Sequence, residues 1–256
     1  MDIVYRDKDV TLIHSDVFEY LKNLENESVD IVITDPPYFL SNGGFSNSGG
    51  KFVSVNKGIW DKDNGNSEEF YSTFLSETYR VLKKDGTIWI FGTMHNIYTI
   101  GYLLKKYNFK ILNNITWQKT NPAPNLSRRM FTHSTETILW AKKNIGKQVF
   151  NYDLMRDENG GKQMKDVWVT SVTSRGEKRF GKHPTQKPIS ILSRIIKAST
   201  TEEMTILDTF IGSGTTAIAA LLNNRKVIGV DNQLEYLNIA IKRIKNINSE
   251  KVGKIK

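Results

Sequence analysis

The hydrophobic positions of the chain alternate between short apolar runs and amphipathic stretches. Residues 29–34 read VDIVIT and residues 87–91 read TIWIF. Runs that are apolar on both faces are typical of strands buried in a parallel sheet. Between them, residues 68–82 carry apolar side chains at helical spacing and are followed by the segment KKDG. We therefore expect an amphipathic helix whose end is marked by basic residues and by Gly86.

The same two patterns continue through the rest of the chain. They predict further strands at residues 10–14, 110–118, 135–141, 205–207 and 226–230, and further helices at 15–24, 96–107, 188–200, 215–223 and 234–247. Residues 39–66 are expected to form a loop, within which the Ser-, Asn- and Gly-rich residues 41–50 are a candidate lid. Since strands alternate with helices, the expected class is α/β with a mainly parallel sheet.

Composition limits the class of protein. The 256 residues include 39% hydrophobic side chains, enough for the core of one domain with an inserted lobe. A net charge of +9 suits a polyanionic partner. The absence of cysteine excludes disulfides, Cys-ligated zinc and thiol nucleophiles. Because no apolar run approaches the ~20 residues of a membrane helix and residues 1–10 hold no signal region, we expect a soluble, cytoplasmic protein.

A glycine-rich turn follows the strand predicted at residues 205–207. In ILDTFIGSGTT, Gly212 and Gly214 allow the backbone to approach a ligand closely, and the next helix offers unpaired amide groups. Asp231 ends the following strand, where a carboxylate can accept hydrogen bonds from ribose hydroxyls. Together with Asp208, these residues indicate an adenosine-binding half of a doubly wound sheet. The alternative is an ordinary strand–helix turn with a capping Asp.

The tetrad Asp35-Pro36-Pro37-Tyr38 follows the buried strand at residues 29–34. Open α/β sheets bind their ligands at this end of their strands. Two prolines fix two φ angles and remove two amide donors, so the turn is rigid and its carbonyl oxygens are acceptors. An Asp oxygen and a carbonyl can accept from one NH₂ group while an aromatic ring stacks on a base. The tetrad therefore suits the exocyclic amine of a flipped nucleobase; the alternative is a strand-ending turn with a surface Tyr.

DPPY together with FIGSGTT resembles the amino-methyltransferases of DNA, which use S-adenosylmethionine. DPPY precedes the glycine-rich turn by about 175 positions. This order is that of the β class, whose Rossmann-like methyltransferase sheet is circularly permuted. The segments HSDVFEYL, HPTQKP and GVDNQLEYLNIAIKRI also match the family. The segments TDPPYFLSNGG, NNITWQKTNPAPNLS, FTHSTETILWAKKN and GKQMKDVW are similar to the second, GATC-specific adenine methylases of DpnII-type restriction systems.

The resemblance implies roles for the tetrad and for the residue after it. Asp35 and the carbonyl of Pro36 would accept hydrogen bonds from the target amine, with Pro37 completing the rigid turn. Tyr38, together with Phe39, would stack on the flipped base. Direct methyl transfer needs neither a covalent side-chain intermediate nor a metal, so positioning and electrostatics would supply most of the rate.

The resemblance also implies a cofactor site. Asp231 would bind the ribose, Asp16 the adenine amine, and Lys187 the methionine carboxylate with help from Thr185. The other cofactor-binding residues predicted are Asp35, Asp208, Phe210, Gly212, Ser213, Gly214 and Thr215. Thr209 departs from the family pattern, which commonly has Pro after the motif Asp.

Residues 142–182 are predicted to form a target-recognition lobe, inserted into a catalytic domain of residues 1–141 and 183–256. This segment has ten Lys and Arg but five Asp and Glu. Contacts to phosphates and base edges are expected from Phe39, Arg128, Arg129, His133, Lys162, Lys165, Arg175, Lys178 and Arg179.

The leading hypothesis is a DNA methyltransferase that modifies adenine N6 in GATC, in duplex and also in single strands, and protects DNA from a companion endonuclease. Asp before Pro-Pro favours adenine in the family. Cytosine-N4 methylation and a catalytically inactive DNA-binding regulator are the alternatives. Many relatives are dimers, so a homodimer is also expected.

Overall fold

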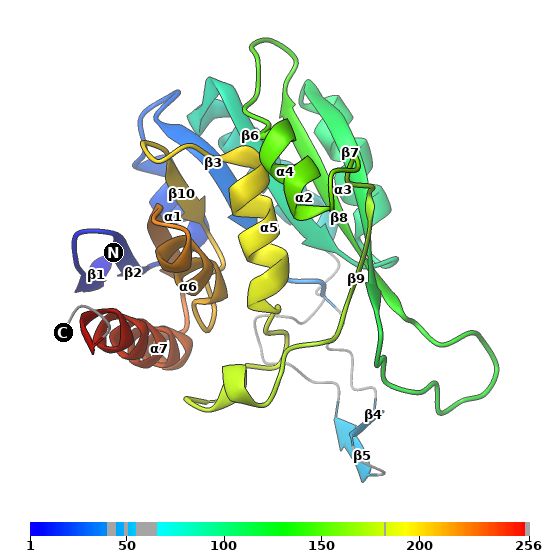
Figure 1. The fold of residues 1–256 in the computed structure, drawn as a ribbon. Coiled ribbons are helices and arrows are strands. Elements are labelled where there is room, and N and C mark those ends of the chain that lie inside the picture. The colour runs from blue at the N-terminus through cyan, green and yellow to red at the C-terminus, as the bar shows by residue number, and fades with distance from the viewer. Residues whose placement is uncertain (40–44, 49–50, 55–65, 182, 254–256) are drawn as a thin grey trace.

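The computed structural model describes residues 1–39, 45–48, 51–54, 66–181 and 183–253. Its main sheet has nine strands in the order β1-β2-β11-β10-β3-β6-β8-β7-β9 (Figure 1). Their bounds are β1 (Asp2–Arg6), β2 (Val10–His14), β3 (Val29–Thr34), β6 (Leu82–Gly92), β7 (Phe109–Lys119), β8 (Thr135–Lys143), β9 (Val167–Thr170), β10 (Thr205–Asp208) and β11 (Lys226–Asp231).

Seven α-helices and one 3₁₀ turn belong to the described parts of the chain. They are α1 (Val17–Lys22), α2 (Ser67–Val81), α3 (Ile97–Lys106), α4 (Tyr152–Glu158), η2 (Gly176–Lys178), α5 (Ile189–Ser199), α6 (Thr215–Leu222) and α7 (Leu234–Gly253). None of the helices described is long and apolar enough to cross a membrane.

The order of the strands places the C-terminal pair inside the sheet. β10 lies parallel to β3, β11 lies parallel to β2, and β10 and β11 are parallel to each other. The late strands therefore separate β2 from β3, although only one helix lies between those two in the sequence. This is the permuted α/β arrangement that the sequence predicts. The parallel unit ends at β6, and β8 pairs with it in the antiparallel sense.

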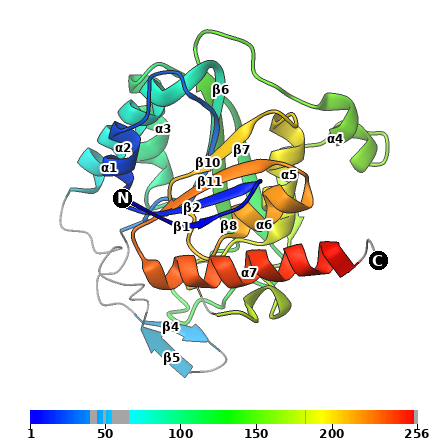
Figure 2. The same ribbon diagram turned by 90° about the vertical axis from the view of Figure 1, so that its left-hand side faces the viewer.

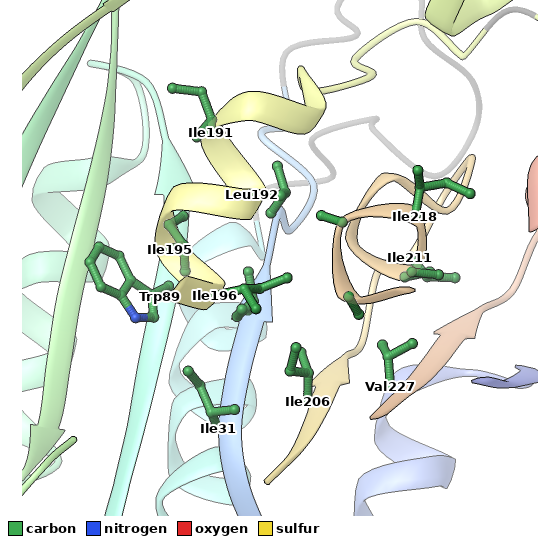
Figure 3. Packing of buried hydrophobic residues seen from close by; sticks show 14 of the residues in the cluster. Ile31, Trp89, Ile191, Leu192, Ile195, Ile196, Ile206, Ile211, Ile218 and Val227 are labelled. Carbon is green, nitrogen blue, oxygen red and sulfur yellow. The ribbon is translucent and has the colours of Figure 1, made fainter. Parts of the chain in front are cut away.

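Two hydrophobic cores lie on opposite faces of the sheet (Figure 2). One is formed with α5, α6 and α7, and the other with α1, α2 and α3. Figure 3 shows how Ile191, Leu192, Ile195 and Ile196 of α5 lie over the sheet. All four are buried. Their burial fixes the position of α5 and therefore of Lys187, two residues before its start.

Some local features differ from the expectation. The helix predicted at 68–82 is present as α2, but KKDG does not form its end: α2 ends at Val81 and β6 begins at once, with Gly86 inside the strand. A Cβ at Gly86 would lie 2.9 Å from the Lys83 carbonyl oxygen of the same strand and 3.1 Å from the Asp30 carbonyl oxygen of β3, so both contacts favour glycine there. β1 was not predicted. The loop at 39–66 contains a hairpin of β4 (Phe45–Ser48) and β5 (Lys51–Ser54). Most of the candidate lid at 41–50 lies outside the described residues.

The segment 142–182 joins the main sheet. Its strand β9 pairs with β7 in parallel, with Val167 opposite Thr116 and Thr170 opposite Lys119. Trp168 of β9 is buried and belongs to the core under α5. The segment thus shares the hydrophobic core of the rest of the chain, and its role in target recognition stays a prediction.

Candidate active site

The carboxyl ends of four parallel strands meet at one edge of the sheet and surround a cavity of about 160 Å³. Asp16 follows β2, the tetrad follows β3, the glycine-rich turn follows β10, and Asp231 ends β11. Of the residues predicted from sequence, the cavity is lined by Asp16, Asp35, Pro36, Pro37, Tyr38, Thr185, Phe210, Gly212 and Asp231. A smaller adjoining cavity of about 40 Å³ reaches Lys187, Asp208, Ser213 and Thr215. The structure therefore brings the predicted catalytic and cofactor residues together.

Hydrogen bonds from neighbouring side chains hold the tetrad in place. The Tyr38 hydroxyl donates to Asp35 Oδ1 at 2.6 Å. Tyr71 of α2 donates to the Pro37 carbonyl at 2.5 Å and accepts from Asn96 at 3.0 Å. Pro36 lines the larger cavity, and the two prolines make its carbonyl a rigid acceptor.

Lys187 is a buried cation beside the tetrad. Its Nζ donates to Asp35 Oδ2 and lies 3.3 Å from the Tyr38 hydroxyl and 3.5 Å from Glu136 Oε2. Burial alone would lower the pKa of this ammonium, but the Asp35 and Glu136 carboxylates raise it above its usual value. Lys187 is therefore a permanent positive charge. The ion pair with Asp35 was not expected, because the prediction assigned Lys187 to the cofactor.

Burial raises the pKa of Asp35, and the repulsion from Glu136 adds to that effect, whereas Lys187 and the hydrogen bond from Tyr38 oppose it. A carboxylate with a raised pKa is a better hydrogen-bond acceptor and proton acceptor than an exposed one. Asp35 thus has the electrostatic character that a group holding an amine requires.

The glycine-rich turn depends on two positive φ angles, +50° at Gly212 and +78° at Gly214. Asp208, buried at the end of β10, accepts hydrogen bonds from the Phe210 amide and the Thr216 hydroxyl. Burial raises the pKa of Asp208 to about 7. Its bonds hold the two ends of the turn together. We infer that it shapes the cofactor site rather than projecting into the larger cavity.

Two further contacts fix the turn from outside. Thr209, which stands where the family commonly has Pro, forms a hydroxyl–hydroxyl hydrogen bond of 3.1 Å with Thr34 at the end of β3. Arg243 of α7 donates to the Ser213 carbonyl at 2.7 Å and to the Thr215 hydroxyl at 3.1 Å. The departure at Thr209 therefore links the two strands that carry the tetrad and the turn.

Asp231 and Asp16 face the larger cavity from neighbouring strands. Asp231 accepts from the Gly212 amide through Oδ2 and from the Gln233 amide through Oδ1, both at 2.8 Å. Burial raises the pKa of Asp231 to about 6. Asp16 caps α1 through Oδ1, which leaves Oδ2 without a hydrogen bond from the described residues. Both carboxylates can accept from a ligand.

Sequence reasoning missed Glu136 and Lys119. Glu136, at the start of β8, pairs with Lys119, at the end of β7, at 2.6 Å. Both line a third cavity of about 250 Å³, together with Tyr38 and Lys187. Tyr38 therefore lies between this cavity and the one beside Asp231. The strands predicted at residues 110–118 and 135–141 follow one another in the sequence, and antiparallel pairing of the two could have placed Lys119 near Glu136.

The residues predicted to contact DNA do not form one group. Arg128, Arg129 and His133 are exposed in the loop between β7 and β8, which extends from the same edge of the sheet (Figure 1). Lys178 lines the 250 Å³ cavity, and the exposed residues Arg175 and Arg179 flank η2.

The three other residues predicted to contact DNA lie in other parts of the structure. Phe39 packs edge-on against Phe70 and Tyr71, with ring centroids 5.2 and 5.7 Å apart. Lys162 follows α4. An ion pair between Glu158 and Lys197 holds α4 at the C-terminal end of α5, whereas Lys187 lies just before the N-terminal end of α5. Lys165 is exposed just before β9.

The model of the DNA methylase family matches residues 29–242, a range that includes the tetrad and the glycine-rich turn. The chain belongs to the DNA methylase family. It is 56% identical to the type II methyltransferase M2.DpnII of Streptococcus pneumoniae over 95% of this chain and 92% of that protein. It is 46% identical to M2.MboI of Moraxella bovis over 94% and 89%. The predicted resemblance to the second methylases of DpnII-type systems is confirmed.

Solved structures support the fold of this DNA methylase. The M1.HpyAVI–SAM complex superposes with a TM-score of 0.70 at 27% identity, covering 92% of this chain and 98% of that one. The cytosine-N4-specific PvuII DNA methyltransferase has a TM-score of 0.74 at 18% identity, with coverage of 99% and 93%. The predicted methyltransferase fold is therefore confirmed.

Proposed function

We propose that this DNA methylase transfers a methyl group from S-adenosylmethionine to adenine N6 in GATC. The observation that carries the proposal is a pair of hydrogen-bond acceptors, the Asp35 carboxylate and the Pro36 carbonyl, beside a cavity suited to an adenosine. On the other side of Tyr38 lies a second cavity, lined by Lys119 and Lys178. One NH₂ group can donate to both acceptors. The Asp before Pro-Pro and the similarity to M2.DpnII favour adenine over cytosine.

The described residues fit S-adenosylmethionine. Asp231 and Asp16 supply carboxylate oxygens for ribose hydroxyls and an adenine amine, and Gly212 leaves room for close backbone contact. Lys187 lines the adjoining cavity. We propose that its ammonium also attracts the methionine carboxylate. The cofactor, when bound, supplies an electrophilic methyl group.

The residues of the chain then orient the amine and handle its proton. Asp35 and the Pro36 carbonyl accept the two N–H bonds, which directs the nitrogen lone pair away from them and towards the cofactor cavity. Tyr38, on the wall between the two cavities, is placed to stack on the base. Asp35 is placed to take the proton that the amine loses, since burial raises its pKa.

The proposed role of Asp231 predicts pH-dependent cofactor binding. Its ionised form accepts hydrogen bonds from ribose hydroxyls, and its pKa is about 6. Affinity for S-adenosylmethionine should therefore be full above that pH and fall as the pH drops through it. Asp231→Asn should weaken binding about 10–100-fold at neutral pH and remove this dependence. Calorimetric titration of both proteins on either side of pH 6 measures the effect. A pH dependence retained by the variant would assign it to another group, such as Asp208, whose pKa is about 7.

We propose that Arg128, Arg129 and His133, with Arg175, Lys178 and Arg179, form the DNA-binding surface. Lys178 lines the cavity that holds Lys119 and Glu136, and Arg175 and Arg179 flank η2, to which Lys178 belongs. The loop that carries Arg128, Arg129 and His133 connects β7, which ends at Lys119, to β8, which holds Glu136. Guanidinium groups there can bind phosphates or base edges. Contacts of Phe39, Lys162 and Lys165 with DNA stay predictions, as do the recognition role of residues 142–182 and a homodimer.

The salt dependence of DNA binding tests this surface. Arg128→Ala and Arg129→Ala should each reduce the slope of log affinity against log salt by about 1 if the side chain neutralises a phosphate. Fluorescence anisotropy with a labelled GATC duplex provides the measurement. Lys8→Ala is the control, because Lys8 is exposed in the turn before β2, at the opposite edge of the sheet. A slope that changes equally in all three variants would contradict the assignment.

The function itself is tested by transfer of labelled methyl groups to matched oligonucleotides, followed by digestion to nucleosides. Duplex GATC, single-stranded GATC and a scrambled duplex are the substrates. We expect N6-methyladenine in both GATC substrates and none in the scrambled one. N4-methylcytosine would replace the adenine assignment, and cofactor binding without any product would favour a DNA-binding regulator. We further propose that the enzyme acts in the cytoplasm and protects DNA from a companion endonuclease, a role supported by its restriction-modification relatives.

A further inference from the structure

Four alternating charges connect the 250 Å³ cavity to the tetrad. Lys119 pairs with Glu136 Oε1 at 2.6 Å, Glu136 Oε2 lies 3.5 Å from Lys187 Nζ, and Lys187 pairs with Asp35. The four side chains come from β7, β8, the segment before α5 and the end of β3. No single motif contains them, yet the fold aligns them in one row.

The row creates a difficulty for the proposed reaction. Lys187 Nζ already donates to Asp35 Oδ2, and the Tyr38 hydroxyl donates to Oδ1. If the Lys187 ammonium stayed on Asp35, it would neutralise the negative charge of Asp35 that the target amine needs. A second acceptor for Lys187 would relieve this competition.

Glu136 has the free acceptor that this relief requires. Its Oε2 is buried and accepts no hydrogen bond from the described residues. Lys119 holds the opposite oxygen, Oε1, so Oε2 is directed towards Lys187. Burial would raise the pKa of Glu136, but Lys187 and Lys119 hold it below its usual value. Glu136 is thus a carboxylate at neutral pH.

We propose that Glu136 is a positioning residue that draws the Lys187 ammonium away from Asp35 when the target amine enters, and so frees Asp35 Oδ2 to accept the amine. The inference rests on the proposed function and adds to the active site a residue that lies outside the tetrad. Lys187 shifts between two carboxylates without changing its own charge. No proton or electron is transferred in this shift, so the charge of the row is conserved.

Other groups near the row could also influence it. Phe91 of β6 presents its ring to Lys187 at 5.4 Å, and the Thr185 carbonyl lies 3.4 Å from Nζ. The titratable and charged groups that face the row are Asp35 and Tyr38 after β3, Tyr71 on α2, Lys119 on β7, Glu136 on β8, Lys178 in η2, His183 and Lys187 before α5, and Asp208 on β10. Among these, only Glu136 offers Lys187 a carboxylate other than Asp35.

Glu136→Gln tests the proposal, because it keeps the size of the side chain and removes its charge. Lys187 should then stay on Asp35, and the repulsion that raises the pKa of Asp35 is lost. We expect kcat for duplex GATC to fall about tenfold, and the acid limb of the plot of kcat against pH to move to lower pH. The Kd of S-adenosylmethionine should change little, since Glu136 does not line the cavity beside Asp231.

Two variants separate positioning from loss of structure. Glu27→Gln is the matched control, because Glu27 also pairs with a lysine of β8, Lys143, at 3.1 Å but lies outside the cavities. It should leave both kcat and the pH profile unchanged. Glu136→Asp keeps the charge and should have the acid limb of the wild-type protein. If Glu136→Gln fails to fold, Glu136→Asp becomes the test. An acid limb that differs from wild type in Glu136→Asp would then overturn the proposal.

The possible outcomes are distinct. A lower kcat with an unmoved acid limb would reduce Glu136 to a structural role and overturn the proposal. An unchanged kcat would also overturn it. If the wild-type protein itself methylates no DNA, the proposed function fails, and the positioning role fails with it. A shifted acid limb that returns in Glu136→Asp would support the inference.

Discussion

Asp35→Asn should lower the rate of methyl transfer about 10²–10⁴-fold, the largest loss of activity we expect from a single substitution. The asparagine keeps the shape of the side chain but loses the charge that attracts the amine and can take its proton. Tyr38 donates to one oxygen of Asp35 and Lys187 to the other, so the asparagine NH₂ group faces one of these two donors and loses that hydrogen bond. Single-turnover transfer to duplex GATC measures the loss without a contribution from product release.

Asp30→Asn is the control for this substitution. Asp30 lies on the same strand, β3, but pairs with Lys83 at 2.6 Å near the surface. The control should transfer methyl groups at the wild-type rate. The Asp35 variant should remain folded, because Lys187 retains Glu136 as a partner. A rate within about tenfold of wild type, in a variant that binds the cofactor normally, would contradict the role of Asp35.

Gly214→Ala should have the largest effect on stability. Gly214 has a φ of +78°, and a Cβ there would lie 2.6 Å from the Cβ of Ala240 and 3.1 Å from its Cα. The backbone strain and the overlap with α7 together should lower the free energy of unfolding by about 2–5 kcal/mol. That is a large part of the ~5–15 kcal/mol typical of folded proteins. Urea denaturation measures the change.

Gly160→Ala separates the two causes. Gly160 has a similar φ of +66°, but a Cβ there would meet nothing within 4 Å. Its replacement should cost only the backbone strain, about 1–2 kcal/mol. Combining Gly214→Ala with Ala240→Gly removes the closest contact and should recover part of the loss. Equal destabilisation at positions 160 and 214 would show that α7 moves aside and that the overlap is unimportant.

For β2, β3 and the two motifs the sequence was a good guide, because their signals are local. β2 and β3 have the predicted bounds, because short runs rich in β-branched residues, such as VDIVIT, favour a buried strand. The tetrad and the glycine-rich turn could be placed at one edge of the sheet, since parallel strands end on the same side. The turn at Gly212 and Gly214 also adopts the positive φ angles that glycine permits.

Contacts between distant segments were beyond such reasoning. The ion pair of Lys187 and Asp35 joins positions 152 residues apart, and neither flanking sequence encodes the approach. Glu136 is a single acid at the start of a strand, and its role depends on the pairing of β7 with β8. At KKDG, pairing of β6 with β3 prevailed over the helix-ending pattern, since Leu82 already lies opposite Val29. Local propensity is a weak guide where tertiary packing decides.

The position of β10 between β3 and β11 has a consequence for the synthesis of the protein. Ile31 on β3 pairs with Ile206 on β10, which leaves the ribosome 175 residues later. At roughly 5–20 residues per second, β3 waits about 9–35 s for this neighbour. During that time the edges of β2 and β3 that will receive β11 and β10 are open to mispairing or to a chaperone. The nascent chain cannot complete its cofactor pocket until these last strands have been translated, so the pocket forms only at the end of synthesis.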